Sequence, residues 1–195
     1  MFKNKKITAV LFARYNSKRL KGKLLKKINN TSLLEISIII LKKIKKIDNI
    51  ILATTDQKED QKILKIANKH GLNCYQGSEN NVLERFYKAV NYFEKNPEIL
   101  IRYCCENPLT SINLIKKNIN KIIKYNYDLI SMVPPSNIVL GTSPIFMNFK
   151  TLDYIYKNAK NKIYLEHVEN YCYDYPEKFK IEYITSNREL YNPET

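Results

Sequence analysis

The sequence is poor in several residue types, and each shortage argues against a class of site. It contains no tryptophan, four glycines, two histidines and four cysteines in 195 residues. The Walker pattern GxxxxGK[ST], which forms a glycine-rich phosphate loop, does not occur. The cysteines show no CxxC spacing, which argues against a structural zinc site. The adjacent Cys104 and Cys105 follow an apolar run and are predicted to be buried free thiols, which indicates a reducing, cytoplasmic compartment.

Long apolar stretches are also lacking. The run from Ile36 to Leu41 is far too short to cross a bilayer. Near the N-terminus, Arg14 interrupts the apolar run that begins at Ile7, and no convincing signal cleavage site follows it. The sequence therefore predicts no membrane partner.

Acidic residues are scarce relative to basic ones. The 33 Lys and Arg residues against 19 Asp and Glu residues give a formal net charge of +14. Such a balance favours nucleic acids, anionic membranes or polyphosphate substrates. The lysines are spread along most segments, however, and no RNP-type, zinc or helix-turn-helix signature is present. Nucleic-acid binding is therefore only a secondary hypothesis, and biased composition is an alternative source of the charge.

What the sequence does contain is a basic loop between Ala13 and Lys23. An apolar, β-favouring run precedes this loop, and a helix start of capping-box type, with Ser32 and Glu35, follows it. A strand, a basic loop and a helix in this order often hold nucleotide phosphates. The cationic side chains of the loop are Arg14, Lys18, Arg19 and Lys23. By itself the loop is equally compatible with a solvated basic turn, because it lacks a Walker-type glycine pattern.

Apolar runs alternate with amphipathic segments along the chain. We predict strands at residues 7–12, 49–56, 72–75, 99–103, 128–133 and 178–184, with one or two short strands within 138–149. We predict helices at residues 33–46, 60–69, 82–94, 111–124, 151–158 and 164–173. The alternation predicts a single α/β domain over residues 1–195, doubly wound around a mainly parallel sheet, with a small C-terminal α+β extension.

Three polar segments should meet at one edge of this sheet, because ligands of such sheets bind beyond the carboxyl ends of the strands. They are the basic loop, Thr54-Thr55-Asp56 and Cys104-Cys105-Glu106. Cations suit phosphates, small polar groups suit a base or a sugar, and a carboxylate suits a metal ion. Periodicity predicts this arrangement but no specific reaction.

Several short motifs, in order, resemble a known family. The run Ala13-Arg14-x-x-Ser17-x-Arg19-Leu20-x-Gly22-Lys23 resembles the signature of the cytidylyltransferases that make CMP-activated acidic sugars. The spore-coat polysaccharide branch, which is related to the CMP-sialate and CMP-Kdo synthetases, is the most similar. The later matches are Ala53-Thr54-Thr55-Asp56, Gly77-Ser78-Glu79 with Val82-Leu83 and Arg85-Phe86-Tyr87 (GSExDVLxRY), Arg102 to Leu109 (RxTGDCPL) and Glu166-His167-Val168.

This resemblance implies a nucleotide-diphospho-sugar transferase fold of Rossmann-like type and a reaction for surface glycan biosynthesis. A sugar hydroxyl would attack the α-phosphate of CTP and release pyrophosphate, with Mg²⁺ as cofactor and a homodimer as the assembly. The implied catalytic residues are Arg14, Lys23 and Glu106, with Glu106 as the metal ligand. The implied nucleotide-binding residues are Ala13, Arg14, Ser17, Arg19, Lys23, Thr54, Thr55 and Asp56. The implied acceptor-binding residues are Val82, Leu83, Arg85, Glu166 and His167, with Arg85 a candidate for a sugar carboxylate.

Purely structural roles are alternatives for these acceptor residues. Val82 and Leu83 are equally compatible with core packing, Arg85 with a surface helix charge, and Glu166-His167 with a cap or a subunit contact.

The chain departs from the family pattern at acidic positions. Glu106 replaces the Asp of TGDCP, and Cys105 replaces its Gly. Asn81 replaces an Asp beside Val82, while Ser143 and Ile145 stand where a GxDxE segment would carry acids. Because Mg²⁺ prefers carboxylate and water oxygens, these changes predict weaker metal binding. They motivate an alternative hypothesis: an inactive relative that binds nucleotide without turnover.

Overall fold

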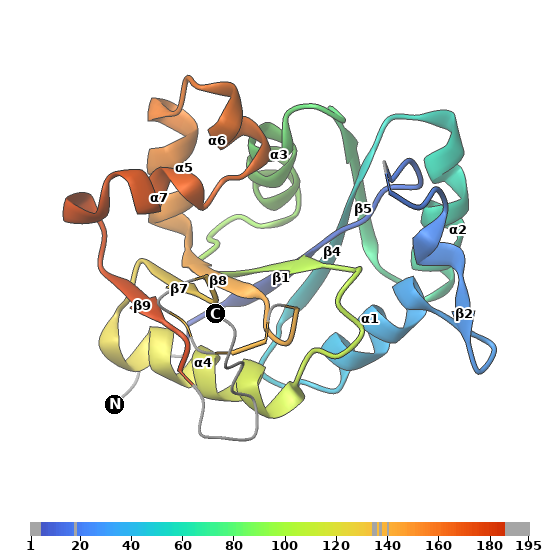
Figure 1. Ribbon diagram of the computed structural model, residues 1–195, viewed down its shortest axis with the longest axis horizontal. Coiled ribbons are helices and arrows are strands. Elements are labelled where there is room, and N and C mark those ends of the chain that lie inside the picture. Colours follow the sequence, from blue (N-terminus) through green and yellow to red (C-terminus); the bar gives the residue numbers. More distant parts are fainter. Residues whose placement is uncertain (1–4, 18, 134–135, 137, 140, 186–195) are drawn as a thin grey trace.

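A computed structural model describes residues 5–17, 19–133, 136, 138–139 and 141–185 (Figure 1). Lys18, which the sequence places in the basic loop, lies outside the described residues. The strands are β1 (Ile7–Phe12), β2 (Lys27–Ile28), β3 (Thr31–Ser32), β4 (Asn49–Thr55), β5 (Asn73–Gly77), β6 (Ile99–Cys104), β7 (Leu129–Ser131), β8 (Ile145–Asn148) and β9 (Ile181–Tyr183).

Helices separate most of these strands. The α-helices are α1 (Leu33–Lys42), α2 (Gln61–Lys69), α3 (Val82–Phe93), α4 (Ile112–Tyr125), α5 (Phe149–Asn158), α6 (Lys162–Glu166) and α7 (Asn170–Asp174). Short 3₁₀ turns are η1 (Lys23–Leu25), η2 (Lys58–Asp60) and η3 (Pro176–Lys178).

Seven strands form one mixed sheet in the order β5-β4-β1-β6-β8-β7-β9. The four strands from β5 to β6 run parallel, whereas β8 runs antiparallel to both β6 and β7, and β9 is again parallel to β7. The central strand β1 is buried along almost its whole length, as expected for a parallel strand covered on both faces. The predicted α/β fold with a mainly parallel sheet is confirmed. The segments expected as a C-terminal extension add β8 and β9 to this same sheet.

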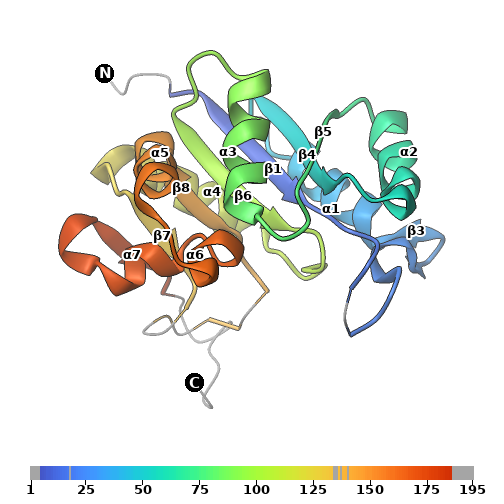
Figure 2. The ribbon, with the colours of Figure 1, turned by 90° about the horizontal axis from the view of Figure 1, so that it is seen from above.

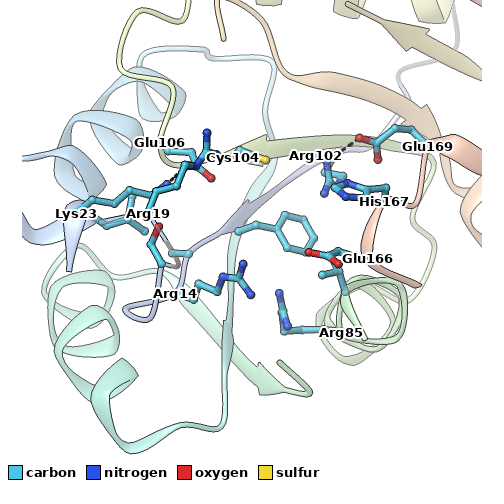
Figure 3. A pocket seen from close by; sticks show the side chains of 15 residues that line it. Arg14, Arg19, Lys23, Arg85, Arg102, Cys104, Glu106, Glu166, His167 and Glu169 are labelled. Carbon is cyan, nitrogen blue, oxygen red and sulfur yellow. Dashed lines mark hydrogen bonds and ion pairs between the residues drawn. The ribbon is translucent and has the colours of Figure 1, made fainter. Parts of the chain in front are cut away.

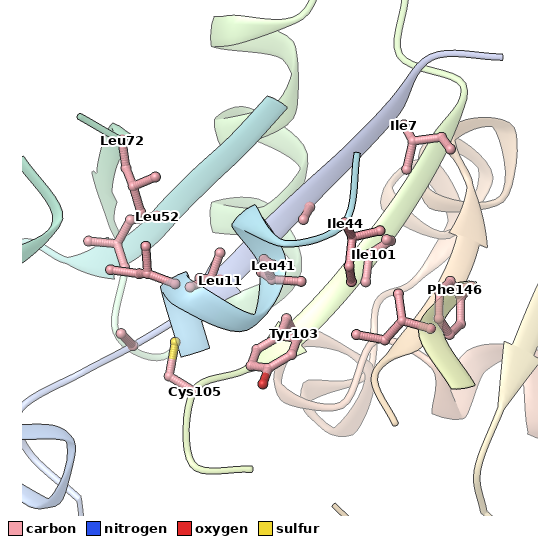
Figure 4. Packing of buried hydrophobic residues seen from close by; sticks show 14 of the residues in the cluster. Ile7, Leu11, Leu41, Ile44, Leu52, Leu72, Ile101, Tyr103, Cys105 and Phe146 are labelled. Atoms are coloured by element: carbon pink, nitrogen blue, oxygen red, sulfur yellow. The ribbon is translucent and has the colours of Figure 1, made fainter. Parts of the chain in front are cut away.

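Two hydrophobic clusters lie on opposite faces of the sheet. In the backbone view of Figure 2, α3 lies in front of the strands and α1 behind them. Buried residues of α1, α2 and α4 belong to one cluster, in which Leu41 and Ile44 pack near Leu11 and Ile101 (Figure 4). Buried residues of α3, α5 and α7 belong to the other. The apolar periodicity that predicted these helices therefore reports the face that each helix turns toward the sheet.

Local sequence signals explain where several helices begin. Ser32 caps α1 as predicted, because its hydroxyl accepts from the Glu35 N–H at 3.2 Å while the Glu35 carboxylate accepts from the Ser32 N–H at 2.9 Å. Ser111 caps α4 in the same manner through the Leu114 N–H. Both N-terminal boundaries could therefore be predicted from the sequence.

Three details of the predicted elements are wrong. Helix α1 ends at Lys42 rather than at residue 46. A small hairpin of β2 and β3 precedes it, and the left-handed Asn29 and Asn30, with φ of 47° and 65°, form its turn. The single helix predicted over residues 164–173 is two short helices, α6 and α7, separated by a break at His167 to Glu169.

No helix in the described part of the chain is long and apolar enough to cross a membrane.

Candidate functional site

A cavity of about 480 Å³ opens beyond the carboxyl ends of β1 and β6. In Figure 3, Arg14, Arg19, Lys23 and Glu106 lie on one side of it and Glu166, His167 and Glu169 on the other. The lining residues are Phe12, Ala13, Arg14, Ser17, Arg19, Lys23, Leu24, Val82, Arg85, Arg102, Cys104, Glu106, Glu166, His167 and Glu169. The parallel topology thus brings together two of the three segments predicted to meet, the basic loop and the segment from Cys104 to Glu106.

The loop after β1 forms the cationic side of the cavity. The Tyr15 carbonyl accepts hydrogen bonds from the Gly22 N–H at 2.8 Å and from the Ser17 N–H at 3.0 Å, which closes the loop on itself. Gly22 has φ +69°, and a Cβ there would lie 3.0 Å from the Tyr15 ring. Glycine is therefore favoured at this position by its left-handed backbone, and any side chain there would also press on the Tyr15 ring.

A buried carboxylate that sequence reasoning missed anchors this loop. Asp60 is 1% exposed and accepts hydrogen bonds from the Tyr15 N–H at 2.6 Å and the Thr55 N–H at 3.1 Å. The Thr55 hydroxyl donates to the same carboxylate. A buried charge is tolerated when several donors satisfy it, so Asp60 joins the loop firmly to the end of β4.

Lys23 and Glu106 form an ion pair on the cationic side of the cavity, and it is drawn as a dashed line in Figure 3. The Lys23 side chain is 18% exposed and that of Glu106 is 45% exposed. Burial, followed by repulsion from Arg19 and Arg14, lowers the pKa of Lys23. The carboxylate therefore faces a site crowded with positive charge, which is suited to an anionic ligand.

The guanidinium carbons of Arg85 and Arg102 lie 5.8 and 5.2 Å, respectively, from the centroid of the Phe12 ring. Arg85 is 4% exposed and donates a hydrogen bond to the Ser78 carbonyl. Within the described residues, it forms no ion pair with a carboxylate. Burial, with repulsion from Arg14 as the next cause, lowers the pKa of Arg85 to about 10. Arg85 is still charged at neutral pH, and it is a buried cation rather than a surface helix charge.

The opposite wall combines a buried ion pair with two exposed residues. Arg102 Nη1 lies 3.2 Å from Glu169 Oε1, and the two side chains are 11% and 13% exposed. Glu166 ends α6 and His167 follows it, and both are exposed at the mouth of the cavity. This wall is therefore polar and close to charge-balanced, unlike the cationic side.

The structure separates the predicted site residues into groups. Ala13, Arg14, Ser17, Arg19, Lys23, Val82, Arg85, Glu106, Glu166 and His167 line the cavity. Thr54, Thr55 and Leu83 are buried and do not line it, which argues against direct ligand contact by these side chains. Asp56 instead lines a second cavity of about 380 Å³, beside Gly77, Ser78 and Glu79.

The neutral residues at expected acidic positions have structural roles. Asn81 caps α3, because its side-chain oxygen accepts from the Glu84 N–H at 2.9 Å. Ser143 is fully buried and Ile145 is 7% exposed, and neither lines the cavity. Within the described residues, no group of three or more His, Cys, Asp or Glu side chains could hold a metal ion.

Sequence reasoning missed four residues that line the cavity, namely Phe12, Leu24, Arg102 and Glu169, whereas Cys104 belongs to a segment that it did place at this edge. Arg102 and Cys104 lie at the end of a predicted strand, so their position was a usable signal for the sheet edge. Glu169 fell inside a predicted helix, and nothing in the local pattern pointed to its partner.

A family model described as "Cytidylyltransferase" matches residues 8–193. An uncharacterized protein of Methanocaldococcus jannaschii is 43% identical over 179 residues, which cover 92% of this chain and 72% of that protein. The spore coat polysaccharide biosynthesis protein SpsF of Bacillus subtilis is 26% identical over 193 residues, which cover 96% of this chain and 78% of that protein.

Solved structures share the fold. A cytidylyltransferase from Leptospira borgpetersenii has a TM-score of 0.86 at 23% identity and covers 95% of this chain and 78% of its own. The CMP:2-keto-3-deoxy-manno-octonic acid synthetase complexed with CTP has a TM-score of 0.70 at 12% identity, covering 93% and 90%. Rv0371c of Mycobacterium tuberculosis in complex with manganese has a TM-score of 0.64 at 10% identity, covering 93% and 88%. The nucleotide-diphospho-sugar transferase-like fold is therefore confirmed.

Proposed function

The chain belongs to the cytidylyltransferase family, and from this premise we propose that it transfers CMP from CTP to an acidic sugar or a related polyol. The reaction releases pyrophosphate and serves the synthesis of a surface glycan. In this proposal residues 1–195 act as one nucleotidyltransferase-like domain, which assembles as a homodimer. The relatives support the nucleotide chemistry, and the similarity to SpsF supports the polysaccharide role.

One observation carries the proposal: three cations of one loop line the same cavity. Arg14, Arg19 and Lys23 face it from the segment after β1, where the parallel sheet opens. A triphosphate needs several positive charges and directed donors, and guanidinium and ammonium groups supply both. A triphosphate held there would pair its charges directly with these cations, of which Lys23 is mostly buried, Arg14 partly exposed and Arg19 exposed.

In the proposed reaction the acceptor hydroxyl oxygen attacks the α-phosphorus of CTP. The new oxygen–phosphorus bond forms while the bond to the β-phosphate oxygen breaks, pyrophosphate leaves, and the hydroxyl proton passes to solvent. Lys23 and the two loop arginines stabilise the negative charge that develops on the departing phosphates. Donors of this kind contribute about 10²- to 10³-fold each to the rate.

Mg²⁺ is the proposed cofactor, and one residue of the cationic side fits it. Mg²⁺ usually binds one or two carboxylates together with substrate phosphates rather than a cage made only of protein ligands. Glu106 supplies a half-exposed carboxylate in the cavity, beside the loop cations and paired with Lys23. The bound ion would neutralise phosphate charge, and Glu106 is the described residue that would hold it.

Arg85 is the proposed contact for an anionic group of the acceptor. It is nearly fully buried, it lines the cavity and it has no carboxylate partner within the described residues. Asp60 and Glu79 attract Arg85 only from beyond contact distance, so a ligand carboxylate there would gain a direct charge pairing that this buried cation otherwise lacks.

Pyrophosphate release tests the proposed function. The protein is incubated with CTP, Mg²⁺ and a panel of sialic acids, 3-deoxy-2-keto sugar acids and polyols, and release above the acceptor-free rate supports the proposal. Lys23→Ala should lower release by about 10²-fold. The matched control is Lys27→Ala, because Lys27 lies exposed on β2 outside the cavity. A folded protein that releases no pyrophosphate with any acceptor contradicts catalysis.

A nucleotide-binding relative without turnover is the second candidate. The burial of Ser143 and Ile145 favours it, because the segment expected to supply acids does not reach the cavity. CTP-dependent thermal stabilisation that ignores Mg²⁺, with no pyrophosphate formed, is its signature.

A further inference from the structure

The ion pair between Arg102 and Glu169 joins two distant parts of the chain inside the cavity. Arg102 lies in β6 and Glu169 lies at the break between α6 and α7, 67 residues later. Figure 3 shows the pair beside His167, on the wall opposite the basic loop. The pair therefore sits where the sheet meets the segment that carries the exposed residues of this wall.

Apolar packing holds much of that segment, because Val168, Tyr171 and Cys172 are buried in the second hydrophobic cluster. Helices α6 and α7 have five residues each, and helices so short are not stable by themselves in water. Between them, Val168 is fully buried, and the His167 carbonyl accepts from the Asn170 N–H at 3.1 Å. These contacts hold the turn together, whereas the pair with Arg102 supplies a directed polar link from the turn to β6.

Stability alone is a weak reason for such a pair. Replacing a buried ion pair with apolar residues of similar volume is often neutral or stabilising, because the desolvation of two charges offsets their attraction. Each partner also retains an unused polar atom: Arg102 Nε and Glu169 Oε2 are buried without hydrogen-bond partners. Both residues line the cavity. A pair that costs desolvation and lines a ligand cavity is better explained by specificity than by stability.

We propose that Arg102 and Glu169 are positioning residues for the acceptor half of the cavity. The pair fixes the α6–α7 turn against β6 and thereby places Glu166 and His167 at the cavity mouth. Because Glu169 balances the charge of Arg102, the acceptor meets Arg85 as the cation without a carboxylate partner in the described part of this wall. This inference rests on the proposed function for its substrate but not for its structural content.

Three variants and one matched control test the proposal. Arg102→Met and Glu169→Gln each break the pair, while the apolar double variant Arg102→Met with Glu169→Leu removes both charges. The control is Lys121→Met with Glu182→Leu, because this pair is also partly buried, with side chains 25% and 23% exposed, and joins α4 to β9 outside the cavity.

The first measurement is amide hydrogen exchange in the wild-type and variant proteins, which needs no catalysis. In all three variants we expect exchange in residues 163–173 to rise about tenfold, corresponding to about 1.4 kcal/mol, while the loop between β1 and η1 stays unchanged. The control should change neither region. Unchanged exchange in residues 163–173 overturns the proposal even if no acceptor is ever found.

The second measurement is steady-state kinetics with the acid of the panel that gives the fastest pyrophosphate release. We expect the KM for that acid to rise about tenfold in all three variants, with the KM for CTP within about twofold of wild type. The apolar double variant is decisive, because it restores packing without restoring the pair. A wild-type acceptor KM in that variant, or an equal rise in both KM values, reduces the pair to a structural role and overturns the proposal.

Discussion

Glu106→Gln should tighten the binding of metal-free CTP, although it removes a proposed catalytic residue. In the structure Glu106 pairs with Lys23, so a triphosphate that arrives without a metal ion must displace this carboxylate and then remain beside it. Glutamine keeps the size of the side chain and removes its charge. Lys23 is then free to bind a phosphate, and the repulsion between carboxylate and phosphate disappears.

The magnitude follows from the exposure of the pair. Two unit charges 4 Å apart interact by about 1 kcal/mol in water and about 4 kcal/mol at an effective dielectric constant of 20. Because the Glu106 side chain is 45% exposed, the effect should lie near the lower value. A gain of about 1 to 2 kcal/mol corresponds to about 5- to 30-fold tighter binding.

Isothermal titration calorimetry with CTP in the presence of EDTA measures this affinity directly. Glu166→Gln is the matched control, because it removes the same charge from the opposite side of the same cavity and leaves Lys23 paired. The control should change the affinity by less than about twofold. Unchanged or weaker binding by Glu106→Gln would refute the reasoning. With Mg²⁺ and an acceptor present, Glu106→Gln should no longer release pyrophosphate.

Further predictions concern the supports of the site. Gly22→Ala should destabilise the protein by about 1 to 3 kcal/mol and weaken CTP binding, since a Cβ would strain a left-handed residue and press on the Tyr15 ring; chemical denaturation and calorimetry measure the two effects. Asn81→Ala should lower the free energy of unfolding by about 1 kcal/mol through loss of the α3 cap, whereas Asn81→Asp should retain stability. Ser32→Ala should also cost about 1 kcal/mol at pH 7. Because the Ser32 hydroxyl and N–H lower the pKa of Glu35, that stabilisation is present above the unfolded pKa and is lost as the pH falls through the folded pKa. Urea titrations at pH 7 and pH 3 should therefore show a smaller difference between wild type and Ser32→Ala in acid, and an equal difference at both would contradict this account.

Local patterns predicted the elements that local interactions control. The capping box of Ser32 with Glu35 and the cap at Ser111 lie within four residues of their partners, so the sequence marked these helix starts correctly. The ends were less predictable. Helix α1 ends at Lys42, where the chain turns toward β4. Residues 43–48 contain no glycine or proline, so the sequence contained no signal for this turn.

The contacts that complete the site join residues far apart in the chain. Asp60 accepts a hydrogen bond from the amide of Tyr15, 45 residues earlier in the chain. The sequence indicated only that Asp60 begins an amphipathic helix, and nothing near it predicted this contact. Arg102 and Glu169 are 67 residues apart, and one of them was predicted to lie inside a regular helix. Neither pairing has a sequence period, so periodicity could not have predicted either one.

The sequence by itself determined the alternation of strands and helices, the helix caps and the cationic loop between Ala13 and Lys23. Each of these depends on spacings of a few residues, which the backbone periods of helix and strand impose directly. Only the tertiary structure decided that Glu106 faces Lys23, that Arg85 is buried without a carboxylate partner among the described residues, and that Thr54 lies outside the cavity. Those outcomes depend on which elements the sheet places side by side and on how deeply packing buries each charge, and no local pattern of residues encodes either property.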